Sequence, residues 1–377
     1  MSRVERWRML HLPDFAALSP EQDDVLDLPL DSSVIVTGPP GTGKTIIAIW
    51  RANMLHRSER PTLLLMYGKL LSGYTHAAVE KSGTDGVVST YHSWFPRFFK
   101  EAYGMSPPKV DRYNFDWDEC KKVIMQSPVP AAERRHIIVD EGQDLPQDFF
   151  LVLRLISRSM TILADENQRI TSDQSTIEEI KAVTGIHEVR TLTTNYRNTR
   201  PIAEFAAEFY TGLPTGRPQL PPPSRRGERP ALYGHRNLYD AVAQIVAYER
   251  ANPDRSIGVM VPYTVQVKSL YNRLSGKTRA PVQGYLSNQR GHGMPQLDFS
   301  KPGVKLVTWA SAKGLEFDTV FLPELQSFKG DPRSDDFRMK MYVLASRAKS
   351  QLFLQYSGEG VPAIIRELPS GLFEDRR

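Results

Sequence analysis

The chain alternates short apolar runs, rich in β-branched residues, with longer segments in which apolar residues recur at helical spacing. This alternation is typical of an α/β fold, in which helices cover the faces of a parallel sheet. In the first half we predict a helix at 45–56, and a capping box from Ser175 to Glu178 predicts another that begins after Ser175. The apolar runs of this half predict strands at 34–37, 62–66, 87–90, 137–140 and 161–164.

The same alternation returns in the second half of the chain. Helical spacing predicts helices at 200–210, 238–251 and 265–274. Apolar runs predict strands at 256–261, 304–308, 319–322 and 352–356. We therefore expect two similar α/β domains in tandem, at 1–189 and 190–377.

Three segments interrupt this pattern. Residues 96–135 indicate a small insertion in the first domain. Residues 213–230 hold six prolines, which prevent a regular element and predict a surface connection. Residues 276–303, rich in Gly, Gln and Ser, predict a long loop or hairpin.

Composition narrows the class of protein. The 377 residues are 40% hydrophobic and 24% charged, which is ordinary for a soluble protein of about two domains. The net charge of +5 is a mild basic bias, compatible with a polyanionic partner. The single cysteine, Cys120, excludes a disulfide framework and fits a reducing cytoplasm. No apolar run approaches the roughly 20 residues of a membrane span, so we expect no membrane association.

A glycine-rich turn follows the first predicted strand. Its sequence at 38–45, GPPGTGKT, matches G-x-x-x-x-G-K-[ST] between a strand and a helix. Such a loop turns its backbone N–H groups onto phosphates, while Lys44 reaches the β- and γ-phosphate oxygens and Thr45 ligates Mg²⁺. We therefore predict an ATP site at Gly38, Gly41, Thr42, Gly43, Lys44 and Thr45.

A pair of acids follows the strand predicted at 137–140. We expect Asp140 to hold Mg²⁺ and Glu141 to polarise the attacking water. An acidic pair also suits the first turn of a helix, which is the structural alternative. The three apolar residues before the pair, and Gly-Gln-Asp after it, favour the catalytic interpretation.

Further motifs lie in a fixed order along the chain. They are LSPEQ at 18–22, STYHS at 89–93, VDEGQD at 139–144, ADENQ at 164–168, LTTNYRN at 192–198, TWASAKGLEF at 308–317 and YVLASRAK at 342–349. With these motifs the chain resembles superfamily 1 helicases of the UvrD/Rep type over almost its whole length. The resemblance implies two tandem RecA-like P-loop domains with parallel sheets.

The resemblance also implies roles for individual residues. Gln22 would read adenine, Tyr196 would stack on it, and Glu316 would contact the nucleotide. Gln168 would sense the γ-phosphate. Arg197 and Arg347 would bring positive charge to the phosphoryl group as the two domains close. The catalytic set is then Lys44, Glu141, Gln168, Arg197 and Arg347.

The positions that contact a nucleic-acid strand in the family depart from its pattern. The family has aromatic residues after the position of Gln168, whereas residues 169–173 hold none, and Ala310 stands where the family has histidine. Base stacking contributes about 1–3 kcal/mol per base, so these losses should weaken the grip on a strand. The remaining candidate contacts are Tyr67, Thr90, His92, Trp94 and Trp309, each of which suits a core or cleft-lining position equally well.

These features predict a nucleic-acid-stimulated ATPase that acts as a compact translocase or helicase. Single-stranded DNA is the expected substrate, with RNA as an alternative. A protein partner is expected because a motor with few strand contacts suits a larger system, such as phage defence or DNA repair. The alternative is an ATP-driven switch that signals to a protein and unwinds little. A nucleotide-binding scaffold without catalysis is disfavoured, because the catalytic set is complete.

Overall fold

The computed structural model describes residues 18–66, 88–111, 114–165, 175–211, 219–286, 294–295, 297–299 and 301–377. The described residues fall into two compact units that divide between Thr193 and Thr194. We refer to them as the amino-terminal and carboxyl-terminal units. The sequence pattern placed the boundary after residue 189, whereas β6 (Val189–Thr191) pairs with β1 (Val34–Thr37) and so belongs to the amino-terminal unit.

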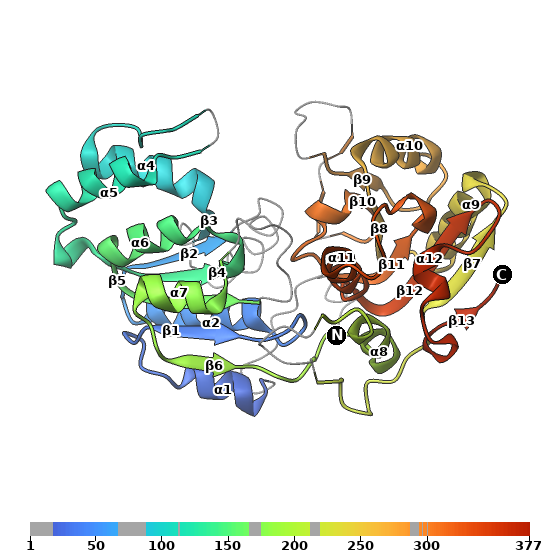
Figure 1. The fold of residues 1–377 in the computed structure, drawn as a ribbon, viewed down its shortest axis with the longest axis horizontal. Helices are drawn as coiled ribbons and strands as arrows, with labels where there is room; N and C mark the ends of the chain where they lie inside the picture. Colours follow the sequence, from blue (N-terminus) through green and yellow to red (C-terminus); the bar gives the residue numbers. More distant parts are fainter. Residues whose placement is uncertain are drawn as a thin grey trace. The chain divides into compact units, whose positions relative to one another are not determined.

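The amino-terminal unit is built on a six-stranded sheet in the order β3-β2-β4-β5-β1-β6, with all neighbours parallel. Its other strands are β2 (Thr62–Met66), β3 (Val88–Thr90), β4 (Arg135–Asp140) and β5 (Ser157–Ala164). Its helices are α1 (Pro20–Leu26), α2 (Lys44–Arg57), α4 (Tyr91–Tyr103), α5 (Trp117–Gln126), α6 (Gln147–Ile156) and α7 (Ile177–Thr184) (Figure 1).

The carboxyl-terminal unit is built on a seven-stranded parallel sheet in the order β13-β7-β12-β11-β8-β10-β9. Its strands are β7 (Ala231–His235), β8 (Ser256–Val261), β9 (Val282–Gly284), β10 (Gly303–Thr308), β11 (Phe317–Leu322), β12 (Ala348–Ser357) and β13 (Glu374–Asp375). Its helices are α8 (Arg200–Ala207), α9 (Leu238–Ala251), α10 (Thr264–Leu274), α11 (Asp335–Ala345) and α12 (Ala363–Arg366).

The two sheets have the same topology. If the edge strand β9 is set aside, the second sheet runs β10-β8-β11-β12-β7-β13, which matches β3-β2-β4-β5-β1-β6 strand for strand and in chain order. Thus β7 corresponds to β1, β8 to β2, β10 to β3, β11 to β4 and β12 to β5. The predicted α/β class, two tandem domains with parallel sheets, is confirmed.

One local prediction was wrong. The capping box of α7 is formed by Thr176 and Glu179, one residue later than predicted, because Thr176 has the extended backbone of a helix cap while Ser175 is buried and bonds to Leu145. In the segment 276–303, predicted as a long loop or hairpin, the described residues include the short strand β9, which pairs in parallel with β10. By contrast, β1, β2, β8 and α9 have the predicted bounds.

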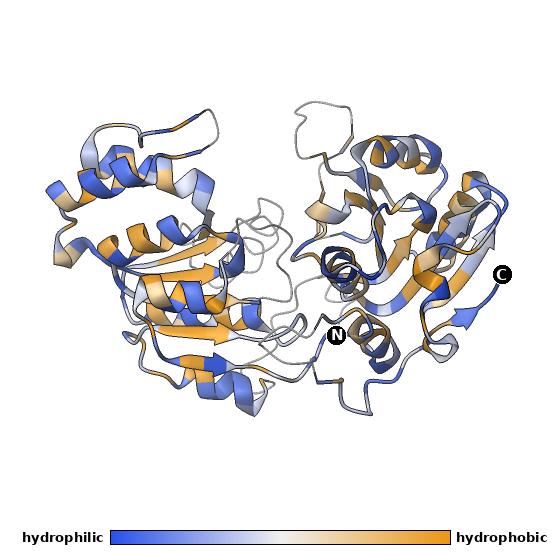
Figure 2. Cartoon of the chain, viewed as in Figure 1, coloured by the Kyte–Doolittle hydropathy of each residue, from blue (hydrophilic) through white to orange (hydrophobic). Residues whose placement is uncertain are grey.

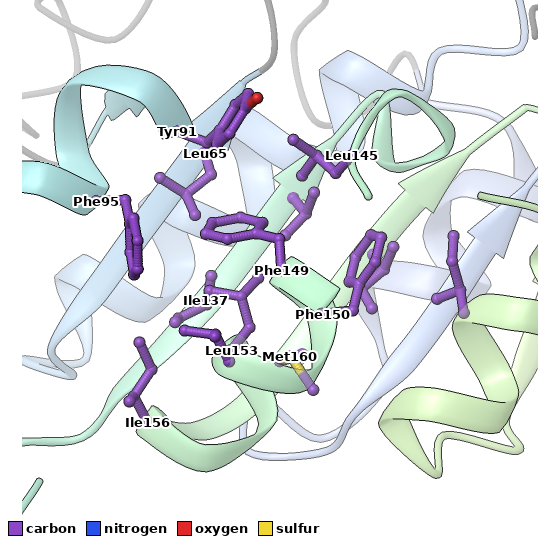
Figure 3. Close-up of a cluster of buried hydrophobic side chains, with 14 of the residues drawn as sticks. Leu65, Tyr91, Phe95, Ile137, Leu145, Phe149, Phe150, Leu153, Ile156 and Met160 are labelled. Atoms are coloured by element: carbon purple, nitrogen blue, oxygen red, sulfur yellow. The ribbon is translucent and has the colours of Figure 1, made fainter. Parts of the chain in front are cut away.

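The predicted insertion at 96–135 packs into the main core of the amino-terminal unit. Phe149 of α6 packs against Phe95 of α4, at 5.9 Å between ring centroids, and against Trp117 of α5, at 5.7 Å. Figure 3 shows Phe149 beside Phe95 and Tyr91, above the strands of the sheet. Buried Cys120 and Ile124 of α5 belong to the same cluster. The helices α4 and α5 therefore form a layer of the domain instead of a separate module.

Apolar residues predominate in the strands of both units, as the orange colouring of the sheets shows (Figure 2). No helix among residues that the structure describes combines the length and apolar character that a membrane span requires.

A buried polar network lies inside the amino-terminal unit, toward the amino-terminal ends of β4 and β5. His136 shares hydrogen bonds with Ser159 at 2.5 Å and Thr161 at 2.9 Å, and Arg51 of α2 donates to Thr161 at 2.9 Å. Arg51 also donates to the carbonyl of Pro29 at 2.7 Å, which ties α2 to the segment before β1. Burial and the charge of Arg51 lower the pKa of His136 to about 3.

This network predicts acid sensitivity. An unfolded histidine has a pKa near 6.5, so His136 stabilises the fold fully only above that value and loses its contribution as the pH falls toward 3. Lowering the pH from 7 to 5 should cost about 2 kcal/mol through this one residue. Urea unfolding at both pH values should show a larger loss for the parent than for His136→Gln, which does not titrate. If the parent and His136→Gln lose the same free energy of unfolding between pH 7 and pH 5, His136 is not the source of the acid sensitivity.

Candidate nucleotide site

The glycine-rich loop joins β1 to α2 and surrounds the ammonium group of Lys44. The Lys44 Nζ donates to the carbonyl oxygens of Gly38, at 2.5 Å, and Pro39, at 3.1 Å. The same nitrogen lies 3.5 Å from the carboxylate of Asp165, at the end of β5. Lys44 is only 7% exposed, so its ammonium group is held inside the loop. Phosphate oxygens that enter the loop can replace the two carbonyl oxygens as its hydrogen-bond acceptors.

Gln22 of α1 contacts this loop. Its Oε1 accepts from the backbone N–H of Ser19 at 3.0 Å, and its Nε2 donates to the carbonyl of Thr42 at 2.8 Å. A Cβ on Gly43, where φ is +89°, would lie 2.3 Å from that Nε2, so the position requires glycine. Gln22 thus sets the position of the loop, and its reading of adenine stays a prediction.

Thr45 and Asp140 meet across the carboxyl edge of the sheet. The Thr45 hydroxyl donates to Oδ2 of Asp140 at 2.7 Å. Burial and the neighbouring carboxylate of Glu141 raise the pKa of Asp140 above its usual value, against the opposing effects of Thr45 and Lys44. A buried carboxylate beside a hydroxyl is the oxygen-donor set that Mg²⁺ prefers, so these two residues fit the predicted metal site.

Glu141 is held in an unusual backbone conformation next to Asp140. Its φ of +55° is left-handed, which is uncommon for a residue with a side chain and costs roughly 1–3 kcal/mol. The following Gly142 has no room for a side chain, since a Cβ there would lie 2.8 Å from Cγ2 of Ile162. The sharp turn brings the carboxylate of Glu141 back to the edge of the sheet where Asp140 lies.

Gln143 fixes the Glu141 carboxylate and was missed by the sequence analysis. Its Nε2 donates to Oε2 of Glu141 at 2.6 Å, and its Oε1 accepts from the backbone N–H of Asp165 at 2.8 Å. The side chain is fully buried, so the amide links the ends of β4 and β5 away from water. Its position in the VDEGQD motif was the available signal, but the sequence does not reveal its two partners.

The carboxyl-terminal unit repeats this arrangement. Glu324, which follows the corresponding strand β11, also has a φ of +55°. Gln326, two residues later, accepts from the backbone N–H of Ser357 at the end of β12, at 3.2 Å. The turn from β7 to α9, however, consists of Arg236 and Asn237 and has no phosphate-binding lysine and threonine. This repeat therefore has the acidic turn but not the loop of a nucleotide site.

Arg197 and Glu316 form an ion pair within the carboxyl-terminal unit. Lys349 approaches the same carboxylate at 3.4 Å. Burial alone would raise the pKa of Glu316, but the charges of Arg197, Lys349 and Arg347 lower it, so the carboxylate stays ionised. The Nε and Nη1 atoms of Arg197 are buried without a hydrogen-bond partner in the described parts of the chain, which leaves donors available to an anion.

Arg347 lies deeper than its predicted role suggests. It is 1% exposed, and its guanidinium donates to the carbonyl of Val343 at 2.9 Å and to the hydroxyl of Ser346 at 3.2 Å. The neighbouring motifs are joined by Asn198, whose amide donates to the carbonyls of Ser346, at 3.1 Å, and Ala348, at 2.5 Å. Asn198 was also missed from the sequence. The predicted nucleotide contact Tyr196 is 36% exposed in the same motif.

The predicted nucleic-acid contacts differ in exposure. Trp94 is 6% exposed and stacks on Phe98 at 4.9 Å, and Thr90 caps α4 by accepting from the N–H of Ser93 at 3.3 Å. Both of these have structural roles in the core and the helix cap. His92 is exposed, and Trp309 is half-buried. Tyr67 and the predicted γ-phosphate sensor Gln168 lie outside the described residues.

Comparison with known proteins matches two family models. Residues 25–174 match an AAA domain, and residues 286–359 match the UvrD-like helicase C-terminal domain. The first contains the glycine-rich loop and the acidic pair, and the second contains Trp309, Glu316 and Arg347.

Individual proteins are similar over shorter stretches. The RecBCD enzyme subunit RecB of Chlamydia pneumoniae is 43% identical over 54 residues, which are 14% of this chain and 5% of that protein. A protein named as an ATP-dependent DNA helicase of Acanthamoeba polyphaga mimivirus is 23% identical over 244 residues, 58% of this chain and 34% of that one. The chain thus spans about a third or less of the length of these relatives. The solved complex of the Arterivirus nonstructural protein 10 helicase with DNA covers 89% of this chain and 62% of its own, at 14% identity and a TM-score of 0.40.

The geometry of Glu141 predicts a separation of binding from chemistry. Glu141→Gln should leave ATP affinity intact and slow hydrolysis about 10²-fold or more, because the amide cannot take a proton from water. Nucleotide affinity and turnover can be measured on the same preparation. The matched control is Glu324→Gln, which makes the same change at the equivalent turn of the other sheet and should hydrolyse ATP at the parent rate. Parent-like turnover in Glu141→Gln would rule out the assignment of the base.

Proposed function

We propose that the chain is a UvrD-like, superfamily 1 helicase-type enzyme, a nucleic-acid-stimulated ATPase that translocates along single-stranded DNA. The observation that supports this most directly is the set of contacts around the glycine-rich loop. The ammonium of Lys44, the Thr45–Asp140 pair and the Glu141–Gln143 pair all lie at the ends of β1, β4 and β5. Charge, metal ligands and a base are thereby available for phosphoryl transfer.

Each residue in this set has a separate task in the proposed reaction. Lys44 places a fixed positive charge against the phosphates, and the backbone of the loop binds their oxygens. Mg²⁺, held through Thr45 and Asp140, would neutralise phosphate charge. Glu141 orients a water molecule and accepts its proton, while Gln143 keeps the carboxylate aimed at the edge of the sheet.

Arg197 is the proposed source of positive charge in the second unit. Its pairing with Glu316 holds the guanidinium in one orientation, while Nε and Nη1 keep unused donors. A cation delivered to the phosphoryl group in this way accelerates transfer about 10³-fold or more in related chemistry. We propose that Arg347 supports this arrangement from within the core, because its donors bond to its own unit.

Weak strand binding by the isolated chain is part of the proposal. Two of the predicted strand contacts, Trp94 and Thr90, are buried, which favours a motor that depends on a protein partner for its grip. A larger assembly for phage defence or DNA repair would supply that partner. The same burial favours the second candidate, an ATP-driven switch whose target is a protein.

The test is ATP turnover by the purified chain, with and without single-stranded DNA, followed by strand displacement on a tailed duplex. We expect turnover to rise several-fold with DNA, because a motor couples hydrolysis to its track, and we expect little displacement of long duplexes at near-physiological salt. The same turnover measurement with single-stranded RNA shows which nucleic acid stimulates the enzyme. If neither nucleic acid changes the rate of ATP turnover, the proposed motor function is wrong and the ATP-driven switch is favoured. If the isolated chain unwinds duplexes processively, the proposed dependence on a protein partner is wrong.

A further inference from the structure

The proline-rich segment of the carboxyl-terminal unit, described from Gln219 onward, lies along the chain that carries Arg197. Gln219 itself forms a parallel β-bridge with Thr194. Farther along, the backbone N–H of Arg200 donates to the carbonyl of Arg225 at 2.8 Å. A segment that the sequence predicted only as a surface connection is thus joined to residues on both sides of Arg197.

The side chain of Arg225 holds the backbone at Arg197. Its Nη2 donates to the carbonyl oxygen of Arg197, and its Nε donates to that of Asn198 at 3.3 Å. The donors of a guanidinium lie in a rigid planar fork, so two contacts made together define the positions of both peptide groups. Arg225 is therefore placed to fix the main chain from which the side chain of Arg197 extends.

The remaining contacts of Arg197 complete this arrangement. Oδ1 of Asn195 accepts from the backbone N–H of Arg197 at 2.9 Å, so both polar groups of the Arg197 backbone have fixed partners. Glu316 pairs with its guanidinium, whose Nε and Nη1 keep the unused donors described above. A long side chain delivers its charge to a defined point only if its own backbone is fixed, and a misplacement of about 1 Å can slow a reaction about 10²-fold.

Gly227 provides a second, uncharged contact between the same two stretches of chain. A Cβ on Gly227 would lie 2.6 Å from both Cβ and Cγ2 of Thr199, the residue before α8. Carbon atoms that are not bonded prefer a separation of about 3.5–4.0 Å, so only glycine lets the segment approach this closely. The close fit at Gly227 thus supports the contacts that Arg225 makes two residues earlier.

We propose that Arg225 is a positioning residue for Arg197, and that the proline-rich segment holds the backbone of this arginine for catalysis. Arg225 acts through Arg197 and not on the nucleotide, because its Nε and Nη2 donate to backbone carbonyls of its own unit. This inference rests on the proposed function, which assigns the guanidinium of Arg197 to the phosphoryl group.

The test compares ATP turnover, with oligothymidine present, by Arg225→Ala, Arg197→Ala and the variant that combines them. Arg225→Ala should lower kcat about tenfold and leave KM for ATP within about twofold of the parent, because the guanidinium of Arg197 remains but its backbone is less fixed. The combined variant should be no slower than Arg197→Ala, since a residue that acts only through Arg197 then has nothing to position. The matched control is Arg226→Ala, which removes the same charge from the next, exposed position and should turn over at the parent rate.

A second pair of variants tests the contact without removing a charge. Gly227→Ala should slow turnover in the parent background but not in the Arg197→Ala background, because the added Cβ pushes the segment away from Thr199. Its matched control is Gly371→Ala, in the same unit, where an added Cβ points into open space among the described residues. Circular dichroism should show parent-like folding for every variant compared.

The outcomes separate this inference from the proposed function. If Arg197→Ala is slow but folded Arg225→Ala turns over at the parent rate, the positioning role is wrong while the role of Arg197 stands. If the combined variant is about tenfold slower than Arg197→Ala, Arg225 acts independently of Arg197 and the positioning role is again wrong. If Arg197→Ala itself turns over at the parent rate, the proposed role of Arg197 fails, and the positioning role fails with it.

Discussion

The amide of Gln143 is the interaction on which the candidate nucleotide site depends. It is fully buried, and its two ends bond to the carboxylate of Glu141 and the backbone N–H of Asp165. Asp165 in turn lies 3.5 Å from the ammonium of Lys44. One side chain thus connects the base, the neighbouring strand and the phosphate-binding loop. An amide left buried without these partners would be destabilising, so the network favours a single arrangement of the three.

Comparison with the carboxyl-terminal unit shows which part of this arrangement recurs in both sheets. Glu324 has the same left-handed backbone as Glu141, and Gln326 accepts from the end of the next strand as Gln143 does. Such a turn therefore belongs to the parallel sheet itself, in which the loop after one strand is tied to its neighbour. Only the amino-terminal unit adds Lys44 and a glycine-rich loop beside the turn. Nucleotide chemistry therefore depends on Lys44 and the glycine-rich loop, which the turn of the carboxyl-terminal unit does not have beside it.

The parts of the fold that the sequence predicted are those with a clear local signal. Strands such as β1 and β8 are unbroken apolar runs, and the glycine-rich loop has a strict pattern between a strand and a helix. Strand β9 was not predicted, because three residues at a sheet edge are too few to show a distinctive pattern of apolar residues. The burial of Trp94 and the two partners of Gln143 depend on packing between distant segments.

The central claim is that Gln143 holds Glu141 in position for catalysis, and single-turnover hydrolysis of prebound ATP tests it most directly. The variant Gln143→Ala should still bind ATP but cleave the bound nucleotide at least tenfold more slowly, because the carboxylate loses its fixed orientation. Its matched control is Gln326→Ala, which removes the equivalent amide from the other sheet and should cleave at the parent rate. Parent-like cleavage by a folded Gln143→Ala protein would contradict the account.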